Sequence, residues 1–296
     1  MNKKLLITTI LLTIIYIISI NKDTNFIMPQ NKVIDNEIYY VDIDYKNKHV
    51  KLSLEDYVIG VVAAEMPASF EIEALKAQGI AARTYLINNV SMNKTLKTDT
   101  NFQVYIDKNE MKNKWKDKYD YYYNKIKEAV LSTKGKILTY NNQPIKAFYY
   151  SMSNGYTESS INVFNEYYDY LTIKESKWEQ DNIQTKTINR SDFCNLLSIN
   201  CNNINISNIK LDESNRVETI TINDKKFSGI EVRQKLSLRS TDFTIDINED
   251  NINITTKGYG HGVGMSQYGA NSMAKEGYKY DEIVKYYYQN IEISNM

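Results

Sequence analysis

Apolar and polar positions alternate in some parts of the chain and recur with a helical period in others. Residues 37–44 (EIYYVDID) and 49–54 (HVKLSL) alternate about a short polar turn, which predicts a β-hairpin. The apolar run that follows, Glu55–Glu65 (EDYVIGVVAAE), predicts a buried helix. This helix is expected to end before Pro67, because proline disfavours helical geometry in the residue that precedes it.

A second helix is predicted beyond this proline. Ser69 is a suitable N-cap, and Glu71 and Glu73 favour a first turn, where the helix dipole is positive. One face of this helix then carries residues at helical spacing, namely Ile72, Leu75, Gln78, Ala82 and Leu86.

The pattern of apolar and polar residues changes twice in the middle of the chain. Residues 91–118 are polar and have no clear period, so we expect irregular chain there. A helix is predicted over Tyr119–Ser132, and Lys136–Tyr140 and Ile145–Ser151 are expected to form two paired strands.

Short β-branched or alternating stretches dominate residues 185–257, among them Val217–Ile222 and Phe243–Ile247. This texture predicts a β-rich inserted lobe. Two further helices are expected to start near Ser266 and near Asp281. With helices around the Glu65 region and a β-rich insert, the predicted fold class is α+β.

The N-terminus carries a different signal. Lys3 and Lys4 precede the apolar run Leu5–Ile20, which is the pattern of an export signal or a membrane anchor. No small-residue cleavage site follows the run, which favours an uncleaved single-pass anchor with the rest of the chain outside the cytoplasm. A cleaved signal peptide is the alternative.

Composition narrows the function. The 296 residues include 36 basic and 36 acidic side chains, so the net charge is zero, which argues against nucleic acid as the main partner. Cys194 and Cys201 are the two cysteines, and in an exported chain they could form a disulfide. No zinc-type ligand spacing is present.

Glu65 is the carboxylate with the clearest chemical potential. It ends an apolar run, and burial raises the pKa of a carboxyl, so Glu65 could act as a general acid. A helix-end glutamate that merely pairs with a cation is the alternative. Lys76 and Arg83 share a face of the next helix and could orient Glu65 or hold a substrate group, although solvated surface charge is the usual outcome.

Residues 258–270 (GYGHGVGMSQYGA) contain five of the eleven glycines together with His261. The stretch matches no phosphate-loop pattern and has no basic residue, so a tight turn that allows close backbone approach is favoured. Ser151 and Ser153 (YSMSNGYTES) follow a predicted strand, where polar groups often line a site. A metal-dependent hydrolase that uses His261 remains a weakly supported alternative.

Three long stretches carry a resemblance to a known family. These are EDYVIGVVAAEMPASFEIEALKAQGIAARTYL, SMSNGYTESSINVFN and GYGHGVGMSQYGANSMAKEGYKYDEIVKYYY, with TDTNFQVY between the first two. From about residue 37 to its end, the chain resembles the stage II sporulation protein D family, which includes engulfment enzymes of spore formers and related amidase-enhancer proteins.

The resemblance implies a lytic transglycosylase that cuts the β-1,4 bond between N-acetylmuramic acid and N-acetylglucosamine in peptidoglycan and leaves a 1,6-anhydro end. Glu65 falls on the catalytic acid of the family. The residues that would line the groove or support Glu65 are Lys76, Arg83, Ser151, Ser153, His261, Gln267 and Tyr268. A non-catalytic glycan-binding enhancer of a cell-wall amidase is the alternative.

The resemblance also implies an organisation and partners. We expect an anchor or signal at 1–22, a linker at 23–36, a catalytic lobe at 37–184, the β-rich insert at 185–257, and a glycine-rich turn with C-terminal helices at 258–296. The expected place is the engulfing mother-cell membrane. The expected partners are glycan strands stripped of stem peptides, a cell-wall amidase and a multispanning membrane protein.

Zinc is a point of departure from the family. Some clostridial relatives bind zinc near the stretch SMSNGYTES through histidine and cysteine. Here residues 148–165 contain neither residue type, so we expect no metal and no other cofactor.

Overall fold

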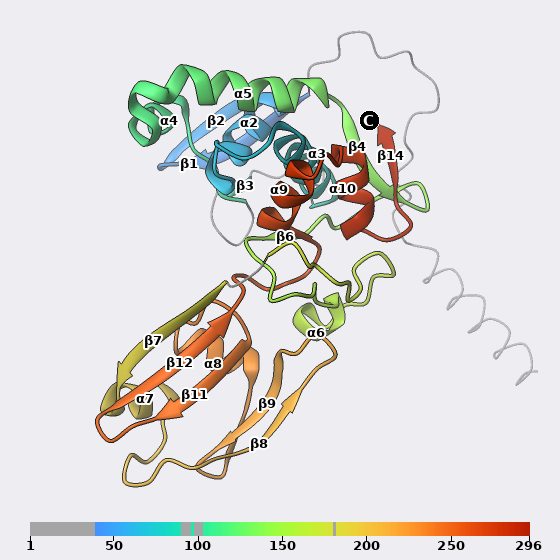
Figure 1. The fold of residues 1–296 in the computed structure, drawn as a ribbon. Helices are drawn as coiled ribbons and strands as arrows, with labels where there is room; N and C mark the ends of the chain where they lie inside the picture. The colour runs from blue at the N-terminus through green and yellow to red at the C-terminus, as the bar shows by residue number, and fades with distance from the viewer. Residues whose placement is uncertain (1–38, 90–95, 98–102, 180–181) are drawn as a thin grey trace, which may run out of the picture. The chain divides into compact units, whose positions relative to one another are not determined.

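The computed structural model describes residues 39–89, 96–97, 103–179 and 182–296 (Figure 1). It contains both helices and strands, and its buried apolar side chains form two clusters, the second of which lies within residues 188–254. The predicted anchor and linker, residues 1–36, fall outside the described part. Among the described residues, no helix is both long and apolar enough to cross a membrane.

The predicted hairpin is confirmed. Strand β1 (Tyr40–Tyr45) pairs antiparallel with β2 (Lys48–Ser53), and the short β3 (Leu96–Lys97) pairs parallel with β1. Val41 and Ile43 are buried while the residues between them are exposed, as the period of two requires.

The predicted apolar helix is also confirmed as α2 (Leu54–Glu65). Ser53 caps it, since its hydroxyl accepts a hydrogen bond from the backbone of the first turn at 3.2 Å. Most of α2 is buried, so it lies inside the first apolar cluster. Met66 is extended and Pro67 follows, which makes Glu65 the last helical residue.

The second helix, α3 (Ile72–Asn89), begins later than its predicted cap. Ser69 lies in a turn that is closed by a hydrogen bond from the N–H of Phe70 to the carbonyl of Pro67, at 3.0 Å. The turn keeps Ser69 out of the cap position, so the prediction for Ser69 is wrong.

The prediction of irregular chain over 91–118 is wrong for part of that range, which forms α4 (Lys108–Trp115). Asp107 and Glu110 make a capping box, in which each side chain accepts a hydrogen bond from the other residue's backbone N–H. Met111 is the only buried residue of α4, and the helix therefore lacks an apolar period.

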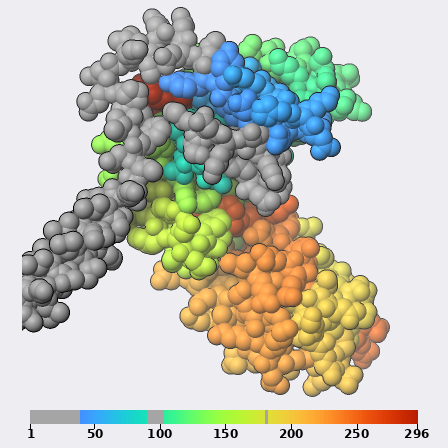
Figure 2. Space-filling model, turned by 180° about the vertical axis from the view of Figure 1, so that it is seen from behind, coloured from blue at the N-terminus to red at the C-terminus, as the bar shows by residue number. Residues whose placement is uncertain are grey.

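A single 3-10 turn, η1 (Lys116–Lys118), leads into α5 (Tyr119–Ser132), which has the predicted bounds. Helix α5 packs against α2 and α3. On the molecular surface the hairpin, in blue, lies beside α4 and α5, in green (Figure 2). An ion pair joins these parts, with 3.4 Å between Lys46 Nζ and Asp107 Oδ2.

Strand β4 (Lys136–Tyr140) forms where it is predicted, but its partners are different. It lies between the two-residue β5 (Gln143–Pro144) and β14 (Glu292–Asn295) at the end of the chain. The predicted partner Ile145–Ser151 contributes only one backbone hydrogen bond, from the N–H of Ile145 to the carbonyl of Leu138.

The rest of that segment turns to another partner. Strand β6 (Tyr149–Tyr150) pairs parallel with β13 (Met265–Ser266) from the glycine-rich stretch. The prediction that Ile145–Ser151 pairs with β4 is therefore wrong beyond the turn. Helices α9 (Gln267–Lys275) and α10 (Tyr280–Tyr287) follow β13 near the predicted starts.

The second apolar cluster belongs to two small antiparallel sheets. One has the order β11 (Asp242–Ile247), β12 (Asn251–Lys257) and β7 (Ile183–Asn189), and the other β10 (Lys225–Ser228), β9 (Val217–Ile222) and β8 (Ile206–Leu211). The helices α7 (Arg190–Leu197) and α8 (Gly229–Lys235) pack with them. Cys194 and Cys201 form a disulfide, with 5.7 Å between their Cα atoms.

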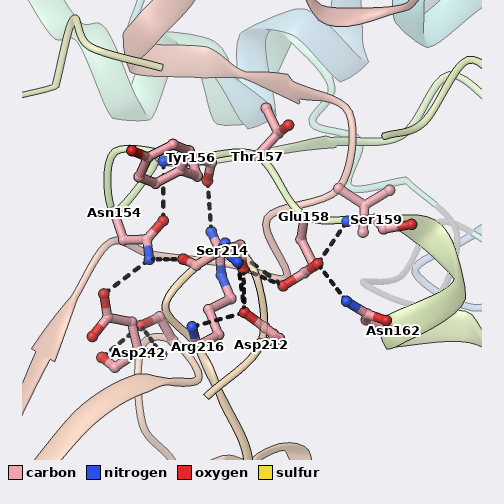
Figure 3. A network of polar contacts seen from close by, with 12 residues as sticks. Asn154, Tyr156, Thr157, Glu158, Ser159, Asn162, Asp212, Ser214, Arg216 and Asp242 are labelled. Atoms are coloured by element: carbon pink, nitrogen blue, oxygen red, sulfur yellow. Dashed lines mark hydrogen bonds and ion pairs between the residues drawn. The ribbon is translucent and has the colours of Figure 1, made fainter. Parts of the chain in front are cut away.

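A buried polar network links these sheets to the segment that ends in α6 (Ser160–Phe164) (Figure 3). Glu158 and Arg216 are almost fully buried, and 3.7 Å separates their charged groups. Ser214 donates a hydrogen bond to Glu158 at 2.5 Å and accepts one from Arg216 at 2.8 Å. Nearby, the Asn154 amide donates to Asp242 at 2.8 Å.

Candidate active site

Glu65 stands at the C-terminal end of α2, where the apolar run stops. Its side chain is partly exposed, and burial raises the pKa of the carboxyl above its ordinary value. A hydrogen bond from the N–H of Val104 to Oε1, at 3.3 Å, acts in the opposite direction. A carboxyl that keeps its proton to higher pH is suited to general-acid chemistry.

Tyr149 of β6 reaches the same carboxyl. Its side chain acts on Glu65 and lowers the pKa of that group. The hydroxyl of Tyr149 accepts a hydrogen bond from the buried amide of Gln103 at 3.1 Å, and the other amide atom of Gln103 accepts one from Tyr57 at 3.3 Å. Since the Tyr149 oxygen already accepts from Gln103, its own hydrogen is available for Glu65.

Gln267, the first residue of α9, is the predicted residue that the structure brings to Glu65. Its side chain lowers the pKa of Glu65, with a smaller effect than the backbone of Val104. Its Nε2 is buried and has no partner at hydrogen-bond geometry within the described residues. An amide donor of this kind beside an acid is available for a ligand oxygen.

Lys114, in the last turn of α4, is a cation of this site that the sequence did not reveal. Its Nζ donates a hydrogen bond to the carbonyl of Ala63 at 2.9 Å, near the end of α2. Its charge lowers the pKa of Glu65, while burial lowers the pKa of Lys114 itself.

The glycine-rich stretch packs along the segment that holds Tyr149. Besides the β6–β13 pairing, isolated bridges join Met152 to Tyr259 and Glu158 to Val263. Gly264 has a φ of +80°, and a Cβ atom there would clash with the carbonyl oxygen of Phe148. The prediction that small residues allow close backbone approach is confirmed here.

His261 lines the site as a neutral imidazole and is not its acid. Burial lowers the pKa of its imidazole to about 4, and Arg233 and Arg216 act in the same direction. Its Nδ1 accepts from the N–H of Val263 at 3.0 Å, which assigns the proton to Nε2, and the ring also hydrogen-bonds the backbone of Tyr149. Tyr149 therefore connects His261 to Glu65.

Tyr268 follows Gln267 and contacts the loop after Glu65. Its ring meets the ring of Phe70 edge to face, with 4.9 Å between the centroids. Its N–H donates to the carbonyl of Ser151 at 3.1 Å, and the hydroxyl of Ser266 also donates to that carbonyl. Ser151 thus positions the start of α9 through its backbone.

Ser153 is buried and belongs to a cluster around Glu179. The N–H of Ser153 donates to Glu179 at 2.8 Å, and the hydroxyls of Ser266 and Ser176 donate to the same carboxylate. Burial raises the pKa of Glu179, and these donors lower it. Glu179 therefore joins three segments behind the site, and neither Ser153 nor Glu179 carries a described contact to Glu65.

Lys76 and Arg83 contact other groups. Lys76 pairs with Glu73 at 2.8 Å. Arg83 is fully buried, pairs with Glu55 at 2.5 Å and donates to the backbone carbonyls of α5 and β4. Glu55 is in the first turn of α2, at the other end of the helix from Glu65, so Arg83 fixes the helix that carries the acid and does not reach the acid itself.

The residues at the family's zinc position do not fit that metal. Residues 148–165 contain neither histidine nor cysteine. Across the described ranges, no group of three or more histidine, cysteine, aspartate or glutamate side chains could hold a metal ion. We therefore assign no catalytic role to zinc.

Sequence reasoning missed four residues around this site, and only some of them left a signal. Gln103 lies in the stretch TDTNFQVY, and the Asp107–Glu110 capping-box spacing could have revealed the helix that carries Lys114. Tyr149 lies in the predicted strand Ile145–Ser151, but nothing in the sequence marked it as a neighbour of Glu65, and nothing marked Glu179.

The chain is similar in sequence to known sporulation proteins. The family model described as stage II sporulation protein matches residues 44–140. The chain is 46% identical over 256 residues to stage II sporulation protein D of Bacillus subtilis (strain 168), covering 82% of this chain and 75% of that one. The corresponding protein of Bacillus amyloliquefaciens is 43% identical over 256 residues, covering 82% and 74%.

A more distant relative is the amidase enhancer of Bacillus subtilis (strain 168). It is 30% identical over 295 residues, which covers 80% of this chain and 40% of the enhancer. The alignments with the two sporulation proteins span most of this chain and most of each relative, at high identity. The chain belongs to the stage II sporulation protein D family.

Proposed function

We propose that this protein is a peptidoglycan lytic transglycosylase that cleaves the β-1,4 bond between N-acetylmuramic acid and N-acetylglucosamine during sporulation engulfment. The observation that carries the proposal is Glu65, a partly exposed carboxyl whose pKa is raised by burial. Val104, Tyr149 and Gln267 act on it from segments that are far apart in the sequence. Membership of the sporulation family supports the cellular process.

The mechanism needs one carboxyl. Glu65 gives its proton to the glycosidic oxygen, and the bond between that oxygen and C1 of the muramic sugar breaks. The 6-hydroxyl of the same sugar then bonds to C1 and returns its proton to Glu65, so water is not consumed. The groups that shift the pKa of Glu65 most are Val104, Gln267, Tyr149 and Lys114, and none of them is a carboxylate, which favours this route over hydrolysis by a carboxylate pair.

The test is mass spectrometry of the products from glycan strands stripped of stem peptides. We expect the intact protein to release products with 1,6-anhydro ends and Glu65→Gln to release none while keeping its fold by circular dichroism. Glu71→Gln is a matched control, because Glu71 is exposed and lies just before α3. Unchanged product release by Glu65→Gln would exclude Glu65 as the acid.

A second candidate function is a non-catalytic glycan-binding enhancer of a cell-wall amidase. It is favoured by the 30% identity to a protein named amidase enhancer. The same assay separates the two, because an enhancer binds glycan and stimulates an amidase without forming any glycosidic product. Reducing ends without anhydro ends would instead indicate a hydrolase.

The proposal includes a place and partners. We propose that Leu5–Ile20 anchors the chain in the engulfing mother-cell membrane, with its remainder outside the cytoplasm. The Cys194–Cys201 disulfide supports an oxidising compartment. We further propose that a cell-wall amidase strips the glycan first, that a multispanning membrane protein completes the complex, and that catalysis uses no cofactor.

A further inference from the structure

Lys114 is a cation placed beside the candidate acid Glu65. Its Nζ is held at 2.9 Å from the carbonyl of Ala63, two residues before Glu65. Lys46, in contrast, is paired, since it contacts Asp107 and Glu110 at 3.4 and 3.0 Å. Lys114 makes no such ion pair with any carboxylate that the structure describes.

The geometry leaves Lys114 free to bind an anion. An ammonium group has three N–H donors, and the carbonyl of Ala63 uses one of them. Lys114 keeps much of its surface exposed although its ammonium is partly desolvated, so a ligand at Glu65 can reach it. A carboxylate adds the attraction between two full charges to the hydrogen bond, which a neutral amide does not, so an anionic ligand is preferred over a neutral one.

The proposed substrate offers one group of this kind. The muramic sugar carries a lactyl ether at O3, on the ring whose C1 bond is broken beside the acid. With a stem peptide attached, the lactyl group ends in a neutral amide. Once the peptide has been removed, the group ends in a carboxylate.

We propose that Lys114 binds the lactyl carboxylate of the muramic sugar at the cleaved bond and thereby selects glycan without stem peptides. This inference rests on the proposed function and deepens it, because it identifies the side chain that distinguishes stripped glycan from peptide-bearing glycan. The same ammonium caps a carbonyl at the end of α2. Substrate selection is therefore built next to Glu65.

The experiment measures binding in a Glu65→Gln background, where no cleavage can occur. Two muramic oligosaccharides are compared by calorimetry, one with free lactyl carboxylates and one with lactyl carboxamides. We expect the carboxylate form to bind about tenfold more tightly, the difference typical of one hydrogen bond to a charged group. Adding Lys114→Met should abolish this preference, and adding Lys114→Arg should retain it.

Lys112→Met is the matched control, because Lys112 lies on the same helix with its ammonium over the Tyr119 ring. It should leave the tenfold preference unchanged. A preference that survives Lys114→Met, or the absence of any preference or binding in the Glu65→Gln parent, overturns the inference. If the role of Lys114 were merely structural, Lys114→Met would weaken the binding of both oligosaccharides equally.

This design distinguishes failure of the proposed role of Lys114 from failure of the proposed transglycosylase function. If the wild-type protein forms anhydro ends but the Glu65→Gln parent shows no carboxylate preference, only the role of Lys114 is wrong. If the preference depends on Lys114 but the wild-type protein cleaves no glycan, the transglycosylase proposal is wrong and Lys114 is a selectivity residue of a glycan binder.

Discussion

The pKa values of two carboxyls of this chain, Glu65 and Glu158, are shifted in the same direction, but the surroundings of the two groups differ. Burial raises the pKa of both. Glu158 is almost fully buried and accepts hydrogen bonds from the Ser159 backbone, Asn162 and Ser214, with Arg216 as its counter-ion (Figure 3).

Glu65, in contrast, is partly exposed and receives one backbone hydrogen bond at 3.3 Å. Within the described residues, Gln267 Nε2 has no hydrogen-bond partner and the Lys114 ammonium makes no ion pair with a carboxylate at contact distance. The difference shows that a raised pKa does not by itself mark a catalytic group. A fully satisfied carboxyl has no capacity left for a ligand, whereas an incompletely satisfied and accessible one can exchange a proton with a substrate.

The largest expected effect is on catalysis and separates the two carboxyls. Glu65→Gln should lower kcat on stripped glycan by about 10²- to 10⁴-fold, the usual contribution of a general acid, with little loss of stability. Glu158→Gln should destabilise the fold but leave kcat per folded molecule within about threefold, because Glu158 touches no reacting group. Comparable losses of kcat in both variants would contradict the comparison.

The next effect is on stability and concerns the counter-ion of Glu158. Arg216→Met leaves a buried carboxylate unpaired, and breaking a buried pair in this way costs about 3–5 kcal/mol. Urea denaturation followed by circular dichroism should show this loss in the free energy of unfolding. As a matched control, Lys210→Met removes an exposed pair with Glu218 and should cost less than about 1 kcal/mol.

The sequence could predict the acid and its helix because both depend on local pattern. An apolar run, a capping serine and a proline define α2 within a few residues, and the helix end places Glu65. The start of α9 at Ser266 was predictable for the same reason.

The surroundings of Glu65 depend on contacts between distant segments and could not be predicted in this way. Strands β6 and β13 have two residues each, too few for a period, and they lie more than a hundred residues apart. Arg83 was expected near Glu65 but pairs with Glu55 at the other end of α2, because spacing along α3 does not say which turn of the neighbouring helix it meets. Lys114 was missed because α4 is polar almost throughout.

An intermediate effect is expected from Tyr149, which connects the glycine-rich side of the site to Glu65. Tyr149→Phe removes the hydroxyl that acts on Glu65 and accepts from Gln103. We expect kcat to fall about tenfold, corresponding to one hydrogen bond to a charged or partly charged group. Tyr156→Phe is the control, since Tyr156 is exposed and should leave kcat unchanged.

The smallest effect is a shift of the pH profile, and it tests whether Lys114 acts on Glu65. Catalysis needs protonated Glu65, so the rate should fall as pH rises through the pKa of this group, which lies above its ordinary value. Tyr57 and Tyr149 also face Glu65, but burial raises the pKa of each above its ordinary value of 10, so they do not titrate in this limb. Lys114 lowers the pKa of Glu65, and Lys114→Met should therefore move the falling limb to higher pH.

This shift is best measured as kcat against pH on the lactyl-carboxamide glycan, which brings no anion to Lys114. Lys112→Met should leave the limb in place. A limb that moves to lower pH, or does not move, would show that Lys114 does not lower the pKa of the acid. Glu65 would then resemble Glu158 more closely, as a carboxyl whose proton is set by burial and by its neutral donors.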